Sequence, residues 1–282
     1  MMIAKITVND KEKILNLTEK KIVLDDQGEE KYYIARMLYY LLKSSYNIPR
    51  LYGYIKGEDP LESWRQTYER TFLQLLKSDL EISSTYFKGK FEIDFGAIQL
   101  SGTLNNMQLS ANVIFKEKPT QIPPGIQGNF QVDSFYYSRT ERIKPYIIPS
   151  SRSGLLYAFS KFLVYQYEGA PGIPKAFGIA AEFINSMLLP QGFSDEIEGH
   201  KIWINSESNS VYVDDSILYN ATSNILSLLA LKTFLTRGTE KELIIIEEPE
   251  VHLNEEEKNL VKKWIYETKS KTVIITNEKD QW

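Results

Sequence analysis

The stretch that decides the fold is Leu243-Ile244-Ile245-Ile246-Glu247-Glu248-Pro249-Glu250-Val251-His252-Leu253. A continuous aliphatic run bounded by charges is typical of a strand that is buried on both faces. Glu247 and Glu248 then lie at the carboxyl end of a parallel strand, where open α/β sheets bind ligands. Acidic groups there can hold Mg²⁺ through water and polarise an attacking water. The alternative interpretation is a buried strand followed by an ordinary acidic helix start, since Asp and Glu favour the first turn of a helix.

The complete stretch closely resembles the Walker B and D-loop segment of the ABC/SMC/OLD-type AAA ATPases, which belong to the P-loop NTPase superfamily. The resemblance implies an α/β fold: an ABC-type head with a mainly parallel core sheet, an antiparallel β-subdomain and helical insertions. It implies ATP and Mg²⁺ as cofactors, with Glu247 supporting the metal and Glu248 acting as the catalytic base. It also places His252 where the D-loop of that family runs along a dimer interface.

Composition sets the limits within which this resemblance must fit. The 282 residues, 43% hydrophobic and 25% charged, are enough for a sizeable core and for one large or two modest domains. A net charge of −4 provides no global basic field to gather nucleic acid. The absence of cysteine excludes disulfides, a thiol nucleophile and a cysteine-based zinc site. Without a long apolar run or a signal-peptide core, we expect a cytoplasmic protein with no membrane association.

The N-terminal region has the layout of a phosphate-binding loop. Two β-like runs, residues 3–8 and 21–24, precede the acidic loop 25–33, and an amphipathic helix follows. Strand, glycine-containing loop, lysine and helix is the order in which such loops hold phosphate. From the expected pattern, Gly28 and Lys31 are present.

Other positions of the loop depart from that pattern. Asp25 and Glu30 stand where glycines would let the backbone approach phosphate, and Tyr32 replaces the Ser or Thr that would bind Mg²⁺. Acids in the loop repel polyphosphate, because each like-charge contact at about 4 Å costs roughly 1 kcal/mol in water and more in a partly dry site. One interpretation is a solvated acidic turn with Lys31 exposed. Beside the C-terminal motif, we interpret the loop as a decayed Walker A.

The middle of the chain predicts an antiparallel subdomain. Apolar and polar residues alternate over residues 90–115, which is typical of a meander with one wet face, and a helix is expected near 61–77. The family carries such a β-subdomain beside the phosphate-loop strand. A hairpin is expected from the runs 201–204 and 210–213.

Domain boundaries follow from composition. Prolines and glycines gather in residues 116–133, which makes this stretch the best boundary in the chain. We predict an N-terminal lobe (1–118), a linker and helical lobe (119–200) and a C-terminal lobe (201–282). Together they would form one composite ATPase-like domain.

Arg152 belongs to a polar turn between a strand at 146–148 and a helix that runs to about residue 167. One interpretation is a simple strand-to-helix turn whose serines cap the helix. The segment Ile-Pro-Ser-Ser-Arg-Ser-Gly-Leu-Leu, residues 148–156, resembles one found in a group of prokaryotic AAA-type ABC ATPases. From this we expect Arg152 to reach a phosphate or a carboxylate of the site.

Thr222, Ser223 and Asn224 open a helix and are good N-cap residues. A helix N-terminus that carries hydroxyl groups can bind an anion. The alternative is a capped core helix with no further role. In context the stretch resembles the ABC signature helix, which contacts the γ-phosphate of ATP held by the opposite subunit. The hydroxyls are kept, and the usual glycine is lost.

Asn277 follows the last predicted strand, residues 272–276, which comes after a polar helix at 254–268. The family usually has a histidine here, which senses the γ-phosphate. An asparagine can donate a hydrogen bond but cannot shuttle a proton.

Two hypotheses about function remain. One is an active ATPase of the OLD/SMC-like class in DNA repair or phage defence, with nucleic acid as a further partner. The other is a pseudo-ATPase with weak or absent hydrolysis that acts with itself or with a paralogous ATPase subunit. Glu247 and Glu248 favour the first, and the acidic loop and Asn277 favour the second. We predict the second.

Overall fold

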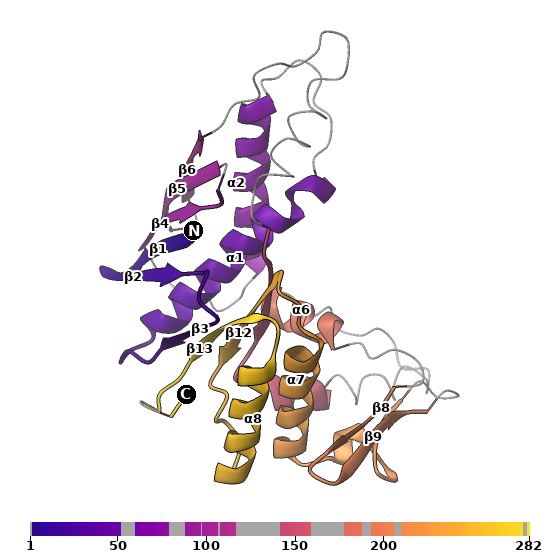
Figure 1. Ribbon diagram of the computed structural model, residues 1–282. Coiled ribbons are helices and arrows are strands. Elements are labelled where there is room, and N and C mark those ends of the chain that lie inside the picture. The colour runs from indigo at the N-terminus through magenta and orange to yellow at the C-terminus, as the bar shows by residue number, and fades with distance from the viewer. Residues whose placement is uncertain are drawn as a thin grey trace.

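The computed structural model describes residues 2–51, 60–78, 88–96, 98–106, 108–116, 142–158, 178–187, 193–205, 210–278 and 281–282. These residues form a mixed α/β structure with three sheets, one parallel and two antiparallel (Figure 1). The proline-rich stretch 117–133, the end of the helix predicted to run to residue 167 and the hairpin tip 206–209 lie outside the described residues. Within the described part, no helix is long and apolar enough to cross a membrane.

The parallel sheet has the strand order β3-β13-β12-β7. Its strands are β3 (Lys21–Leu24), β13 (Lys271–Ile275), β12 (Glu242–Glu247) and β7 (Lys144–Ile148). The acidic stretch supplies β12, which pairs in parallel with β13 on one side and β7 on the other. The prediction of a buried parallel strand ending in two carboxylates is therefore confirmed.

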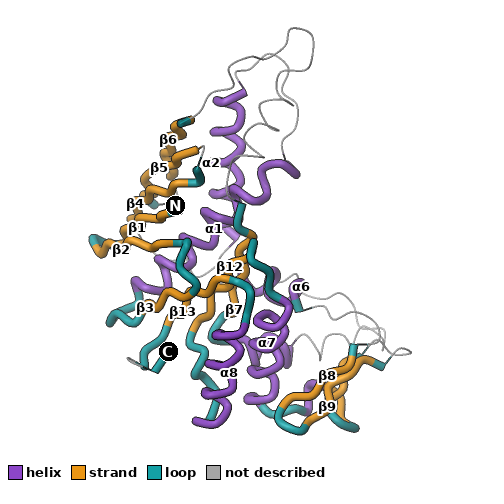
Figure 2. Tube along the Cα trace, viewed as in Figure 1, coloured by secondary structure: helices purple, strands orange, loops and turns teal. Residues whose placement is uncertain are grey.

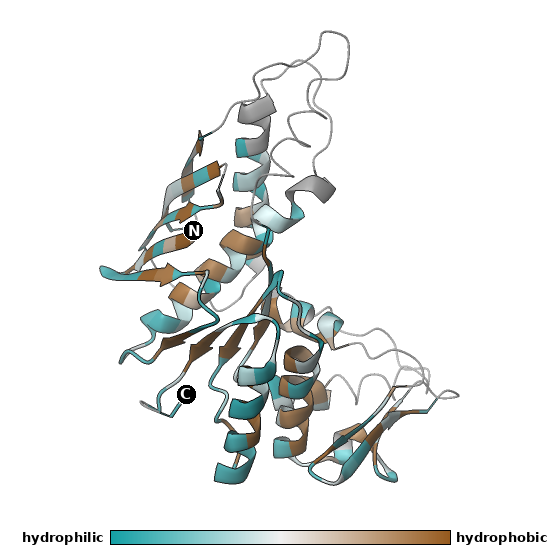
Figure 3. Cartoon of the chain, in the orientation of Figure 1, coloured by the Kyte–Doolittle hydropathy of each residue, from teal (hydrophilic) through white to brown (hydrophobic). Residues whose placement is uncertain are grey.

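Two layers of helix enclose this sheet, and this explains why β12 is apolar on both faces (Figure 3). Leu243 and Ile245 pack in one core with α1 (Glu30–Leu51), while Ile244 and Ile246 pack in a second core with α7 (Ser223–Arg237) and α8 (Glu255–Glu267). All four side chains are at most 1% exposed. Burying each one stabilises the fold by about 1.5–3 kcal/mol.

Helix α7 is apolar on almost every side because it is covered on almost every side. It packs against α8 and against β8 (Ser194–Ile197), which belongs to a small antiparallel sheet. The other strands of that sheet are β9 (His200–Ile204), β10 (Val211–Val213) and β11 (Ser216–Ile217). The predicted hairpin is the β9–β10 pair, so it is confirmed. A short helix, η1 (Leu218–Asn220), leads into α7, and α6 (Gly178–Ser186) also packs on β7.

The larger antiparallel sheet has the order β2-β1-β4-β5-β6. It contains β1 (Ile3–Val8), β2 (Lys11–Asn16), β4 (Lys88–Asp94), β5 (Ile98–Asn105) and β6 (Gln108–Phe115). The predicted meander is β4–β6, and the helix expected near 61–77 is α2 (Pro60–Ser78); both predictions are confirmed. Helix α1 contacts β1 and also the parallel sheet, so it lies between the two sheets (Figure 2).

Candidate functional site

The candidate site lies at the carboxyl edge of the parallel sheet. Because the four strands run the same way, the segments that follow them meet at one edge. The loop after β3 leads to Lys31, β7 to Ser150, β12 to Glu247 and Glu248, and β13 to Asn277. These residues are far apart in the sequence, and the contacts below join them.

Lys31 is buried in the first turn of α1, with 3% of its surface exposed. Its Nζ donates to the carbonyl of Thr276 at 2.7 Å and to Oδ1 of Asn277 at 2.6 Å. It also lies 5.4 Å from the centre of the Tyr32 ring. An exposed Lys31 on a solvated turn, one of the two sequence interpretations, is therefore wrong.

Asn277 connects this lysine to Glu248. Its Nδ2 donates to Glu248 Oε1 at 2.7 Å and to the Tyr32 hydroxyl at 3.1 Å. Tyr32 in turn donates to the same Glu248 oxygen at 2.5 Å. Burial and the bond to Glu248 raise the pKa of Tyr32 well above its usual value, so the phenol stays protonated and donating at neutral pH. Lys31 and Glu248 thus lie in one site, separated by a single amide.

Glu247 is engaged by a residue that the sequence analysis did not identify. Arg36, from the second turn of α1, donates through Nε to Oε1 at 3.0 Å and through Nη2 to Oε2 at 3.4 Å. The backbone N–H of Ser150 donates to Oε2 at 3.3 Å. Glu247 is 1% exposed and Arg36 8% exposed, which makes this a buried ion pair. A signal was present in the sequence: Arg36 interrupts the otherwise apolar run 34–42 of its helix.

Arg152 holds the loop that follows β12. Its guanidinium donates to backbone carbonyls at 3.0–3.1 Å, instead of to a carboxylate, and its Nε donates to Ser227 Oγ on α7 at 2.7 Å. The carbonyls belong to Glu247, Glu248, Pro249 and Val251. Burial lowers the pKa of Arg152 to about 10, so the side chain remains cationic at neutral pH.

This loop needs such support because its backbone is strained. Glu248 and His252 have φ values of 44° and 67°, in the left-handed region that costs most residues about 1–2 kcal/mol. The four carbonyl contacts of Arg152 span the strained segment. Arg152 therefore orients Glu248 through the backbone.

The acidic loop before α1 is partly neutralised by strand β2. Lys11 forms an ion pair with Glu30 at 2.8 Å and also donates to the carbonyl of Gln27 at 3.2 Å, while Lys13 pairs with Asp26 at 2.5 Å. Gly28 is left-handed (φ 107°), and a Cβ there would lie 2.4 Å from Glu30 Oε2. The repulsion expected from these acids is thus reduced by lysines from a strand that the sequence analysis missed.

At the start of α7, Thr222 is the N-cap residue but forms no side-chain cap bond. Its hydroxyl donates to Asn224 Oδ1, and Asn224 Nδ2 donates to Glu257 Oε1 at 2.6 Å. Glu257 also completes a capping box with Asn254 at the start of α8. Asn224 therefore ties the N-termini of two neighbouring helices together, and Ser223 is exposed beside it.

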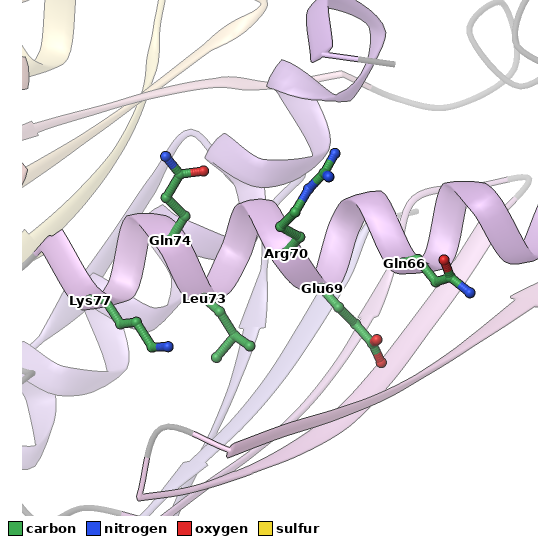
Figure 4. Close-up of a pocket in the computed structure, with 6 residues that line it drawn as sticks. All are labelled: Gln66, Glu69, Arg70, Leu73, Gln74 and Lys77. Carbon is green, nitrogen blue, oxygen red and sulfur yellow. The ribbon is translucent and has the colours of Figure 1, made fainter. Parts of the chain in front are cut away.

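A separate groove of about 580 Å³ lies along α2 (Figure 4). The residues that line it are Gln66, Glu69, Arg70, Leu73, Gln74 and Lys77. All six belong to one helix of the antiparallel lobe. The groove is thus distinct from the edge of the parallel sheet.

The residues at this edge do not fit Mg²⁺ or a bound polyphosphate as they are arranged. Glu247 is neutralised by Arg36, and Lys31 is held by Thr276 and Asn277. The Tyr32 hydroxyl donates a hydrogen bond to Glu248. In the described part of the chain, no three acidic or histidine side chains are grouped so as to hold a metal ion.

Comparison with known proteins finds matches among solved structures. No family model matches the sequence, and no curated protein matches it. Among solved structures, the chain is similar to the SMC head in a crystal structure of that head bound to the C-winged helix domain of ScpA. The two share 9% sequence identity with a TM-score of 0.47, and the match covers 99% of this chain and 91% of the other.

Proposed function

We propose that this chain is an ABC/SMC-head-like protein of the ATPase fold with a degenerate nucleotide site. It hydrolyses ATP weakly or not at all and acts through a second copy of itself or a paralogous ATPase subunit. The observation that carries this proposal is that Arg36 neutralises Glu247 while one amide, Asn277, joins Lys31 to Glu248.

The ATPase fold is supported by the order in which the motifs meet. A strand, a loop with Lys31 and a helix face the acidic end of β12 across the carboxyl edge of one parallel sheet. Lys31 and Glu248 are 217 positions apart in sequence, yet both bond the same amide. Such convergence is what a shared ancestral phosphate site requires.

The loss of tight nucleotide binding is supported by energetics. Breaking a buried ion pair by removing one partner costs about 3–5 kcal/mol. A micromolar site releases about 8 kcal/mol on binding, and each 1.4 kcal/mol is a factor of ten. Displacing Arg36 from Glu247 would therefore weaken a micromolar site to about millimolar affinity or beyond.

Calorimetric titration with Mg-ATP tests the proposal. We expect millimolar binding or none in the wild-type chain, with phosphate release no faster than in Glu248→Gln. Micromolar binding that disappears in Lys31→Ala would instead support the active ATPase of DNA repair or phage defence. Sedimentation over a range of concentrations tests self-association, and filter binding in a salt series tests nucleic acid as a partner.

A further inference from the structure

We infer that Arg36 is a resident cation, which occupies at Glu247 the place that a divalent metal takes in a hydrolytic site of this fold. The inference rests on the proposed function and deepens it. It explains how the carboxylate at the end of β12 is neutralised where it is buried.

Glu247 and Arg36 are arranged as a carboxylate ligand and its cation would be. The Arg36 fork reaches both oxygens of Glu247, at 3.0 and 3.4 Å, and the Ser150 N–H supplies a further donor. A planar guanidinium matches a carboxylate in this way and neutralises it through two bonds. With 1% of Glu247 exposed, water cannot take over this task.

The cost of burying Arg36 indicates that the pairing is specific. Its neighbours on α1, Ile34, Met37 and Leu38, are at most 2% exposed and belong to the core under the sheet. A buried cation is strongly unfavourable unless it is paired, and the same holds for the buried carboxylate. Each residue therefore requires the other, and the pair fastens helix α1 to the end of β12.

An ordinary structural ion pair and a metal substitute predict different behaviour when the arginine is removed. An ordinary pair leaves a buried carboxylate that has lost its ion-pair partner and gains nothing from a divalent ion. A metal substitute leaves the carboxylate of Glu247 able to accept a divalent ion, with water completing the shell of that ion.

Thermal unfolding in EDTA and in millimolar Mn²⁺ tests this difference. The wild-type midpoint is expected to be the same in both. Arg36→Ala should unfold roughly 10 °C lower in EDTA, because the buried Glu247 loses its ion-pair partner, and should regain several degrees in Mn²⁺. Bound Mn²⁺, measured by electron paramagnetic resonance, should appear in Arg36→Ala and vanish in the double variant with Glu247→Gln.

Lys43→Ala is the matched control, because it removes a cation from the same helix whose partner, Glu182, is 2.7 Å away and more exposed. It should show no response to Mn²⁺. If Arg36→Ala does not fold, Arg36→Gln, which keeps an amide donor for Glu247, is measured in the same way.

Two results overturn the inference: stabilisation of the wild type by Mn²⁺ alone, or a folded Arg36 variant that ignores Mn²⁺. Neither depends on nucleotide. Micromolar Mg-ATP binding by the wild type would instead overturn the proposed function, so the two failures are told apart.

Discussion

At the residue scale, the site is defined by the ion pairs and hydrogen bonds between its charged and polar side chains. Asn277 accepts from Lys31 and donates to Glu248 and Tyr32, so one amide satisfies a cation, a carboxylate and a phenol. A histidine at this position could not do all of this at once, because its ring has two nitrogens and no oxygen. The asparagine amide, with its one acceptor and two donors, thus provides a bridge.

Removing this bridge should destabilise the chain. Asn277→Ala leaves the buried Lys31 and the partly exposed Glu248 with one partner fewer each, which costs about 0.5–1.5 kcal/mol. Urea unfolding measures the change, and Asn259→Ala, at an exposed position of α8, is the control that should stay within about 0.5 kcal/mol. An Asn277→Ala variant as stable as its control would show that the bridge carries no stability.

The raised pKa of the Tyr32 phenol predicts that the stability of the fold depends on pH. Its pKa is raised in the folded state, chiefly by burial, so it contributes stability that is complete below the unfolded pKa of about 10 and is lost as pH rises beyond it. The difference in unfolding free energy between the wild type and Tyr32→Phe should be constant from neutral pH to about pH 9 and shrink above pH 10. Ionisation of the other buried tyrosines affects both proteins equally, so its contribution cancels in this difference. If this difference in unfolding free energy stays constant or grows above pH 10, the raised pKa is wrongly assigned to Tyr32.

At the element scale, two segments without regular structure depend on neighbouring elements. The loop after β12 is shaped by Arg152, and the loop before α1 is balanced by Lys11 and Lys13 of β2. The first support is buried and directional, whereas the second is partly exposed and worth at most about 1 kcal/mol per pair.

Arg152→Met should therefore be among the most damaging changes. It keeps the length of the side chain but removes the guanidinium donors to the buried carbonyls of Glu247 and Pro249 and to two part-buried carbonyls of the same loop, at a cost of about 3–5 kcal/mol. Calorimetric melting measures the loss. Arg237→Met, which changes an exposed arginine near the end of α7, should lower the melting temperature by only a small amount. Equal effects of the two substitutions would contradict the role of Arg152.

Strand β5 requires a glycine where it meets the aromatic core. A Cβ on Gly102 would lie 2.5 Å from the Ser110 carbonyl and 2.6 Å from Phe91 Cζ. Gly102→Ala should thus destabilise by about 1–3 kcal/mol. Gly154→Ala is the control: its Cβ meets nothing within 4 Å and it is helical, so the change should stabilise by up to about 1 kcal/mol. Chemical denaturation measures the change in unfolding free energy of each variant, and the two changes should have opposite signs.

At the scale of the whole molecule, local patterns predicted the elements, and the parallel sheet brought the predicted residues to one edge. Glu247 and Glu248 follow from a strand end that periodicity reveals, and Lys31 and Asn277 follow from the resemblance to a known family. Arg36 did not, because its partner is 211 positions away and nothing local indicates the pairing. Strand β2 was missed because half of its residues are charged and only Leu15 is buried. Its lysines matter through sheet register, which no single segment encodes.

The interlocked contacts at the sheet edge have a consequence for the history of the chain. Restoring a phosphate loop would require exchanging Tyr32, Arg36 and Asn277, and any one exchange alone strands a charged or polar group in the interior. Substitutions at this edge should therefore be tolerated together more readily than one at a time, so the edge is expected to change as a unit.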